Sequence, residues 1–136
     1  MLLQKAYKHG SREIITEFCA GMIDEGETPI QAAKRELSEE TGYASSQWEK
    51  IGEVFANPTG SEMKYHFFLA GNCNQMKSPQ QDEAEQIETF LVKSFEKARE
   101  LLTNPKTITS SATMAALVFA EGSVRKKKIG QVFILP

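Results

Sequence analysis

The sequence predicts a single domain of mixed α+β class, and three observations support this. The chain has 136 residues, of which 40% are hydrophobic and 25% are charged, which is typical of one soluble globular domain. Strand-like and helix-like patterns are mixed along its length. No repeat, low-complexity tract or linker divides residues 1–136. We therefore expect one domain with one core.

The first predicted elements are two strands in an antiparallel hairpin. Residues 2–7 and 13–19 have strand character. The segment His9-Gly10-Ser11 between them is rich in turn formers, and Gly10 is placed for a positive φ. A loop over residues 21–28 is expected to follow the hairpin.

A helix is predicted directly after this loop. Thr28 suits the N-cap, Pro29 suits the first helical position, and Gln31 stands where a capping-box partner reaches back. A mostly apolar stripe at helical spacing continues to Thr41, and Gly42 supplies a left-handed stop. We expect this helix to end near Thr41.

The rest of the chain contains further strands and helices. Residues 48–55, 64–69, 87–92 and 132–135 are predicted strands, and the turn Asn57-Pro58-Thr59-Gly60 separates the first two of them. Residues 71–84 form a predicted polar loop. Two helices are expected, at 94–102 with Ser94 as the cap and at 109–120.

Charge and hydropathy exclude some classes of function. The formal net charge of −2 and the pI near 5.8 give no chain-wide field that would attract nucleic acid or an anionic membrane. The longest apolar stretch, residues 114–120, is too short to span a bilayer, and residues 1–5 lack the features of a secretory signal. We therefore expect a cytoplasmic setting, with Cys19 and Cys73 as reduced thiols.

Three acidic residues crowd one face of the first predicted helix. Glu36, Glu39 and Glu40 stand at i, i+3 and i+4, where like charges destabilise a helix by a few tenths of a kcal/mol per pair. A bound cation would remove this repulsion, and hard carboxylate oxygens match the preference of Mg²⁺ or Mn²⁺. The alternative is a solvated acidic face with no ligand.

The residues around these acids resemble the signature of the Nudix hydrolase family. That signature is a Gly, five residues, a Glu, seven residues, and then Arg-Glu-apolar-x-Glu-Glu-x-Gly-apolar. Residues 21–43 fill every position of it, with Gly21, Glu27, Arg35, Glu36, Leu37, Glu39, Glu40, Gly42 and Tyr43. The resemblance implies an α/β/α sandwich, in which the motif forms a loop, helix and loop packed on a mixed sheet.

The resemblance also implies a metal site. Glu36 and Glu40 would be the main ligands of Mg²⁺ or Mn²⁺, Glu39 would assist them, and Ala20 would offer its backbone carbonyl. Arg35 would orient a neighbouring carboxylate, although such an Arg also forms purely structural pairs. Glu27 would contact a metal through water or simply favour the helix N-terminus.

Other segments resemble the ADP-ribose pyrophosphatase branch of the family. Residues 58–62 resemble its Pro-Gly-x-x-Glu loop, and residues 17–21 resemble its Glu-Leu-Pro-Ala-Gly segment, with Cys19 where Pro is usual. Residues 82–87 resemble its acidic loop, which makes Glu83 the candidate general base. The implied substrate-binding residues are Lys8, Glu17, Pro58 and Glu62, and Lys8 stands where this branch often has Arg.

The expected activity is metal-dependent hydrolysis of the diphosphate bond in a nucleoside diphosphate derivative. ADP-ribose or a nucleotide sugar would give a nucleoside monophosphate and a sugar phosphate. The alternative is a Nudix-fold nucleotide-binding or regulatory module with little turnover. A third hypothesis takes residues 125–128 as an RNA-contacting patch, but four basic residues are usually a solvated segment, and we expect no nucleic-acid partner. His9 and His66 are assigned no role.

The family normally has additional strands before the segment that opens this chain. Without them, the strand at residues 2–7 is expected to lie at a sheet edge with unpaired backbone groups. Dimerisation is one way to cover such an edge, and the ADP-ribose pyrophosphatase branch typically forms homodimers. A homodimer is therefore expected here.

Overall fold

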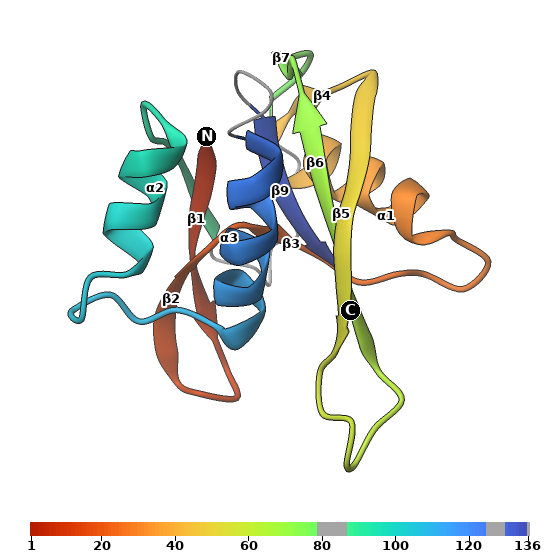
Figure 1. Ribbon diagram of the computed structural model, residues 1–136. Coiled ribbons are helices and arrows are strands. Elements are labelled where there is room, and N and C mark those ends of the chain that lie inside the picture. The colour runs from red at the N-terminus through yellow and green to blue at the C-terminus, as the bar shows by residue number, and fades with distance from the viewer. Residues whose placement is uncertain (79–86, 125–129, 136) are drawn as a thin grey trace.

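A three-stranded antiparallel sheet forms one part of the fold. The computed structural model describes residues 1–78, 87–124 and 130–135, and Figure 1 shows their arrangement. The strand order is β2 (Glu13–Glu17), β1 (Leu2–Lys8) and β8 (Ile87–Leu91). The predicted hairpin is confirmed by the pairing of β1 with β2.

The turn of this hairpin differs from the prediction. The left-handed residue is Arg12, with φ of 58°, and Gly10 does not have a positive φ. The backbone N–H of Arg12 donates to the carbonyl of Lys8 at 2.8 Å. This hydrogen bond closes the turn at its last residue. Arg12 therefore has the left-handed conformation, and the glycine in the middle of the turn does not.

The expectation that residues 2–7 form a sheet edge is wrong. β1 is the middle strand, because β8 pairs with it on the side opposite β2. The register runs from Leu2 opposite Leu91 to Ala6 opposite Ile87. The unpaired edge that favoured dimerisation is therefore absent from β1, and a homodimer stays a prediction without that support.

A four-stranded mixed sheet forms the centre of the molecule. Its order is β3 (Cys19–Ala20), β9 (Gly130–Leu135), β6 (Lys64–Gly71) and β5 (Gln47–Phe55). β9 runs parallel to β3 and antiparallel to β6, so the last strand in sequence lies inside the sheet. A separate short pair joins β4 (Tyr43–Ala44) and β7 (Asn74–Gln75).

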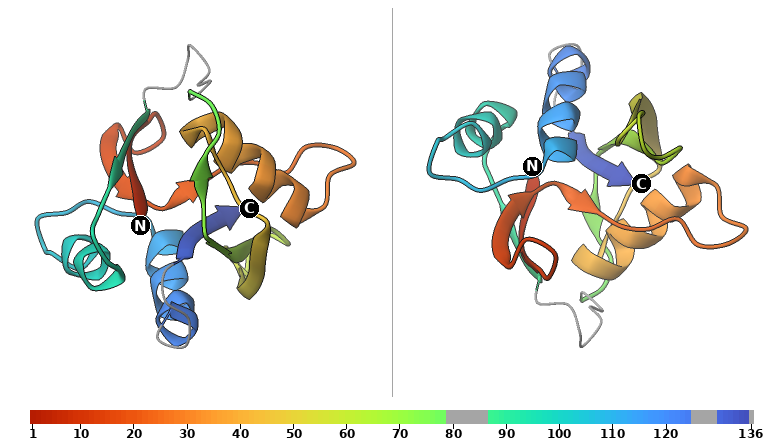
Figure 2. Two further views of the ribbon diagram at one scale, coloured as in Figure 1. Left: turned by 90° about the horizontal axis from the view of Figure 1, so that it is seen from above. Right: turned by 90° about the horizontal axis from the view of Figure 1, so that it is seen from below.

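Helices cover both faces of the mixed sheet, which gives the expected sandwich. α1 (Pro29–Glu36) packs on one face, and α3 (Ser111–Val124) packs on the other, with α2 (Phe95–Leu102) beside it (Figure 2). Side chains of β6 alternate between the two layers. Phe67 and Leu69 join the core under α3, whereas Phe68 and Ala70 join the core under α1.

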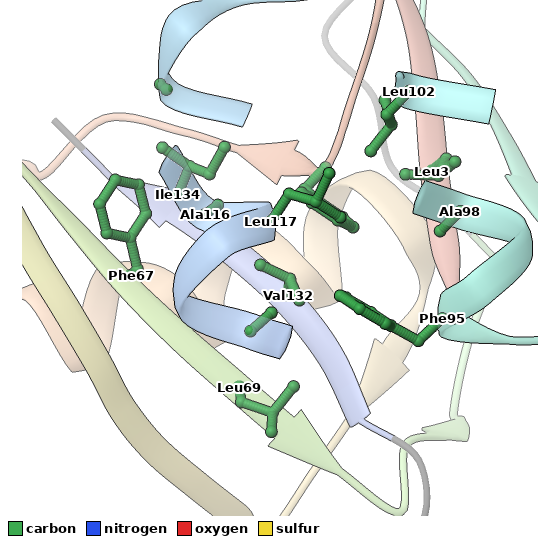
Figure 3. Close-up of a cluster of buried hydrophobic side chains, with 13 residues drawn as sticks. Leu3, Phe67, Leu69, Phe95, Ala98, Leu102, Ala116, Leu117, Val132 and Ile134 are labelled. Atoms are coloured by element: carbon green, nitrogen blue, oxygen red, sulfur yellow. The ribbon is translucent and has the colours of Figure 1, made fainter. Parts of the chain in front are cut away.

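The larger core lies between the mixed sheet, β1 and the two helices α2 and α3 (Figure 3). Leu3 and Phe67 are completely buried within it, and the ring of Phe119 stacks on Phe67 with centroids 5.4 Å apart. Each such buried side chain stabilises the fold by about 1.5–3 kcal/mol. This core fixes β1 and β9 relative to each other, and both strands contribute residues to the site described below.

None of the helices in the described parts of the chain combines the length and the apolarity needed to cross a bilayer. Cys19 and Cys73 are free thiols, as predicted.

Replacing Gly122 by Ala is expected to stabilise the fold. Gly122 lies in α3, and a Cβ added there meets nothing within 4 Å. Glycine inside a helix is destabilising relative to alanine by about 0.5–1 kcal/mol, because it loses more backbone entropy on folding. Urea unfolding of Gly122→Ala should show a gain of about this size. Gly52→Ala is the contrast, since its Cβ would lie 2.7 Å from the ring of Phe119, and it should destabilise.

Candidate functional site

The motif begins at a capped helix, as the sequence predicts. The side chain of Gln31 accepts a hydrogen bond from the backbone N–H of Thr28 at 2.8 Å, and Pro29 is the first residue of α1. α1 ends at Glu36, five residues before the predicted end at Thr41. The chain continues as a single π-helical turn, η1 (Leu37–Thr41), and Gly42 ends it with φ of 73°.

The π-helical turn carries two of the three motif acids. Thr41 stabilises it, because its hydroxyl donates to the carbonyl of Leu37 at 2.5 Å and accepts from the backbone N–H of Tyr43 at 3.2 Å. Such turns occur frequently at functional sites. Here the turn follows directly on Glu36 and contains Glu39 and Glu40, so the wider winding sets the relative directions of their side chains.

A pocket of about 600 Å³ opens beside this turn. Glu36 and Glu40 line it, and so do Ala20 at the end of β3 and Gly21 at the start of the loop before α1. Lys8 of β1 and Glu17 of β2 line it as well, which brings together residues that the sequence places far apart. Of the predicted catalytic and metal-binding residues in the described chain, Arg35 and Glu39 are outside this lining.

Arg35 is the centre of an ion-pair network that includes Glu36 of the pocket lining. Its guanidinium bonds both carboxylate oxygens of Glu27, with Nε–Oε1 at 3.0 Å and Nη2–Oε2 at 2.9 Å. Nη1 donates to Glu36 at 2.9 Å and to Glu39 at 3.1 Å. These bonds raise the pKa of Arg35, and its hydrogen bonds lower the pKa of Glu27. Arg35 therefore fixes the direction of the Glu36 side chain.

Glu36 is held tightly against the motif loop. Its Oε1 accepts from Arg35 and from the backbone N–H of Met22 at 3.2 Å. Burial raises the pKa of Glu36, and the neighbouring Arg35 acts in the opposite direction. A Cβ on Gly21 would lie 2.0 Å from Cδ of Glu36, so only a glycine at this position lets the Glu36 carboxylate lie so close to the motif loop.

The two predicted substrate contacts on β1 and β2 form an ion pair with each other. Nζ of Lys8 lies 2.5 Å from Oε1 of Glu17, and Glu17 is buried while Lys8 is partly exposed. Glu17 is paired with Gln4, and Lys8 lies four residues further along β1 on the same face, so the long side chain of Lys8 reaches back along the strand to Glu17. Glu17 thus holds the ammonium group of Lys8 at the wall of the pocket.

The remaining predicted residues lie elsewhere. Pro58 and Glu62 are exposed in the loop between β5 and β6, outside the pocket, although the adjacent Met63 lines it. Glu83 lies outside the described residues, and so does the basic segment 125–128. Their proposed roles stay predictions. His66 lies 3.4 Å from Glu53 on the mixed sheet, and burial lowers its pKa.

Sequence reasoning missed several residues of the site. Tyr65 of β6, Ser110 before α3 and Ile134 of β9 line the pocket, but nothing in their local patterns distinguishes them from core or loop residues. Gln4 was also missed, although its Nε2 donates to Oε2 of Glu40 at 2.8 Å. A polar residue inside the buried run at the start of β1 was the signal that could have identified it.

The donor chemistry of the site fits a divalent cation. Glu36 and Glu40 offer hard oxygens on one pocket wall, close to the backbone of Ala20. Both hydrogen bonds to the Glu36 carboxylate go to Oε1, which leaves Oε2 for a ligand. In the described parts of the chain, no three acidic, His or Cys side chains are already gathered as a metal site. Arg35 holds Glu36 and Glu39, while Gln4 holds Glu40.

Comparison with known proteins decides the family. The model of the NUDIX domain matches residues 1–110. The chain belongs to the NUDIX domain family. The match includes the whole motif, the strands β1 to β8 and helix α2.

Two curated relatives are similar to this NUDIX chain over most of its length. An ADP-ribose pyrophosphatase of Bacillus subtilis is 31% identical over 93 residues, which are 68% of this chain and 50% of the relative. A GDP-mannose pyrophosphatase of Cronobacter sakazakii is 30% identical over 101 residues, or 70% of this chain and 52% of the relative. The chain thus matches about half the length of these relatives.

A solved structure shares the fold. A crystal structure of an ADP compounds hydrolase superposes with a TM-score of 0.70 at 18% sequence identity. The superposition covers 93% of this NUDIX chain and 67% of the other. The α/β/α arrangement of the described residues is therefore the NUDIX fold.

Proposed function

We propose that this protein is a metal-dependent pyrophosphohydrolase. Its substrate would be a nucleoside diphosphate joined to a sugar, such as ADP-ribose or a nucleotide sugar. Its products would be a nucleoside monophosphate and a sugar phosphate. The observation that carries the proposal is the common pocket, in which Glu36 and Glu40 face the same space as Lys8.

The proposed division of roles follows from charge. Glu36 and Glu40 would hold Mg²⁺ or Mn²⁺, with Glu39 and the carbonyl of Ala20 as further donors. A cation bound there supplies neutralisation of the diphosphate and Lewis acidity at phosphorus. Arg35 would fix the direction of Glu36 and Glu39, since a guanidinium bonds several carboxylates at once. Glu83 is proposed as the general base.

The proposed substrate contacts come from β1, β2 and the loop between β5 and β6. Lys8 would contact a phosphate as a point charge, because an ammonium group lacks the planar fork of Arg. Glu17 would keep that ammonium group in place through the 2.5 Å ion pair. Pro58 and Glu62 would reach the substrate from the β5–β6 loop. The names of the two curated relatives support a nucleotide sugar as the substrate class.

The second candidate function is a nucleotide-binding or regulatory module with little turnover. One observation favours this second function. Arg35 already neutralises Glu36 and Glu39. Such a module would bind metal and nucleotide but release no product. Turnover therefore distinguishes the two functions, whereas metal binding does not.

The test is a substrate panel assayed with and without a chelator. ADP-ribose, GDP-mannose and other nucleoside diphosphate sugars are incubated with the protein and Mg²⁺, and nucleoside monophosphates are separated by chromatography. We expect AMP or GMP from at least one substrate, complete loss of product with EDTA, and recovery on adding excess Mg²⁺ or Mn²⁺. If no substrate gives a monophosphate, the proposal of a hydrolase is wrong and the binding module is favoured.

A further inference from the structure

Gln4 is a buried polar residue in β1 whose side chain reaches the motif. Gln4 is 1% exposed and Glu40 is 6% exposed. Nε2 of Gln4 donates to Oε2 of Glu40 at 2.8 Å, across 36 positions of the sequence. An ionised carboxylate only accepts hydrogen bonds, so the amide nitrogen of Gln4, and not its oxygen, must face Glu40.

The backbone of Gln4 is fixed on both sides. Gln4 pairs with Glu17 of β2 and with Thr89 of β8, and its neighbour Leu3 is completely buried in the core. A side chain on a middle strand at this depth cannot turn out to water without disturbing both pairings. Its amide group is therefore a rigid hydrogen-bond donor to Glu40, which lines the pocket.

Gln4 and Arg35 form hydrogen bonds with different motif acids. Arg35 bonds Glu36 and Glu39 with a full positive charge. Gln4 bonds Glu40 with a neutral amide, which restricts the rotation of the carboxylate but does not cancel its charge. A neutral group thus sets the direction of the Glu40 carboxylate, as the partners of metal-ligating carboxylates commonly do.

We propose that Gln4 is a positioning residue that orients the carboxylate of Glu40 for a divalent cation. The proposal rests on the proposed function, because it takes Glu40 as a metal ligand. Gln4 does not itself touch the cation or the substrate. Its effect is on the affinity of the site for metal, since groups that hydrogen-bond a ligating carboxylate fix its orientation.

The experiment measures Mn²⁺ binding to the full chain without substrate. Electron paramagnetic resonance of free Mn²⁺ gives the Kd for the unaltered protein and for Gln4→Met, which keeps the length of the side chain but removes the donor. We expect the Kd to rise about 10- to 100-fold, as for other partners of metal ligands. Leu3→Val is the matched control, because it loosens the core beside the same strand and should leave the Kd unchanged.

A merely structural role of Gln4 predicts a different result. Gln4→Met would then lower the urea unfolding midpoint, as Leu3→Val does, and its Kd for Mn²⁺ would stay within twofold of the unaltered protein. That result overturns the proposal. Absence of any Mn²⁺ binding by the unaltered protein overturns it as well.

A measurement on the unaltered protein covers the case in which Gln4→Met does not fold. The side-chain amide of Gln4 gives its own signal in a ¹⁵N-correlated NMR spectrum, and Mg²⁺ should shift this signal in parallel with the backbone signal of Glu40. A Gln4 signal that stays in place while Glu40 shifts contradicts the proposal. Failure of the proposed function is seen separately, as Mn²⁺ binding without turnover in the substrate panel.

Discussion

Glu40→Gln is expected to lower kcat by about a hundredfold to a thousandfold while leaving the fold intact. The substitution removes the negative charge of one proposed ligand, and metal stabilisation of a transition state is worth several kcal/mol. The fold should persist because the glutamine oxygen still accepts the hydrogen bond from Gln4, which is 2.8 Å away in the unaltered protein. One like charge is also removed from the crowded motif turn.

The measurement is kcat for the best substrate of the panel at saturating Mg²⁺, together with the thermal unfolding midpoint. Glu100→Gln is the matched control, because Glu100 is an exposed acid on α2 that pairs with Lys97 and is not among the residues that line the pocket. It should keep full activity. Glu40→Gln with near-normal kcat would show that Glu40 is not a metal ligand.

Gly21→Ala is expected to have the second largest effect. The added Cβ would lie 2.0 Å from Cδ of Glu36 and 2.2 Å from its Oε1, so either this carboxylate or the motif loop must move. Movement of the carboxylate breaks its hydrogen bonds with Arg35 and Met22. A misplacement of about 1 Å in a catalytic group can reduce the rate about a hundredfold. We expect a loss of this size in kcat/KM.

Stability should fall less than activity in Gly21→Ala, because an overpacked site typically destabilises by about 1–3 kcal/mol. Gly10→Ala is the control, since a Cβ there meets nothing within 4 Å and the residue has no positive φ. Activity and urea unfolding are measured for both variants. Unchanged kcat/KM in Gly21→Ala would mean that Glu36 can leave its position without effect on catalysis.

Local patterns were sufficient to predict most of the elements. The cap at Thr28, the stop at Gly42 and the cap at Ser94 each depend on neighbours within four residues, and all three are present in the structure. The strand predicted at residues 64–69 is also present, as β6. These features are determined by backbone and side-chain chemistry over one or two turns, which a sequence displays directly.

The features that sequence reasoning missed depend on contacts between distant segments. The π-helical turn follows α1 without any change in helical pattern, so the period of the sequence predicted only one continuous helix. The pairing of β1 with β8 joins residues more than 80 positions apart, and it overturned the predicted sheet edge. Gln4 reaches Glu40, and Tyr65 reaches the pocket, through contacts that are not local in sequence.

The position of β9 affects how the protein folds while it is being synthesised. β9 follows every other strand in sequence, yet it lies between β3 and β6 and its Ile134 carbonyl accepts from the N–H of Gly21. On the ribosome, strands β1 to β8 emerge first, and the N–H of Gly21 has no Ile134 carbonyl to bind until residues 130–135 leave the exit tunnel. Until then the edges of β3 and β6 that pair with β9 have unpaired backbone groups, and unpaired strand edges make a partly folded chain prone to aggregation.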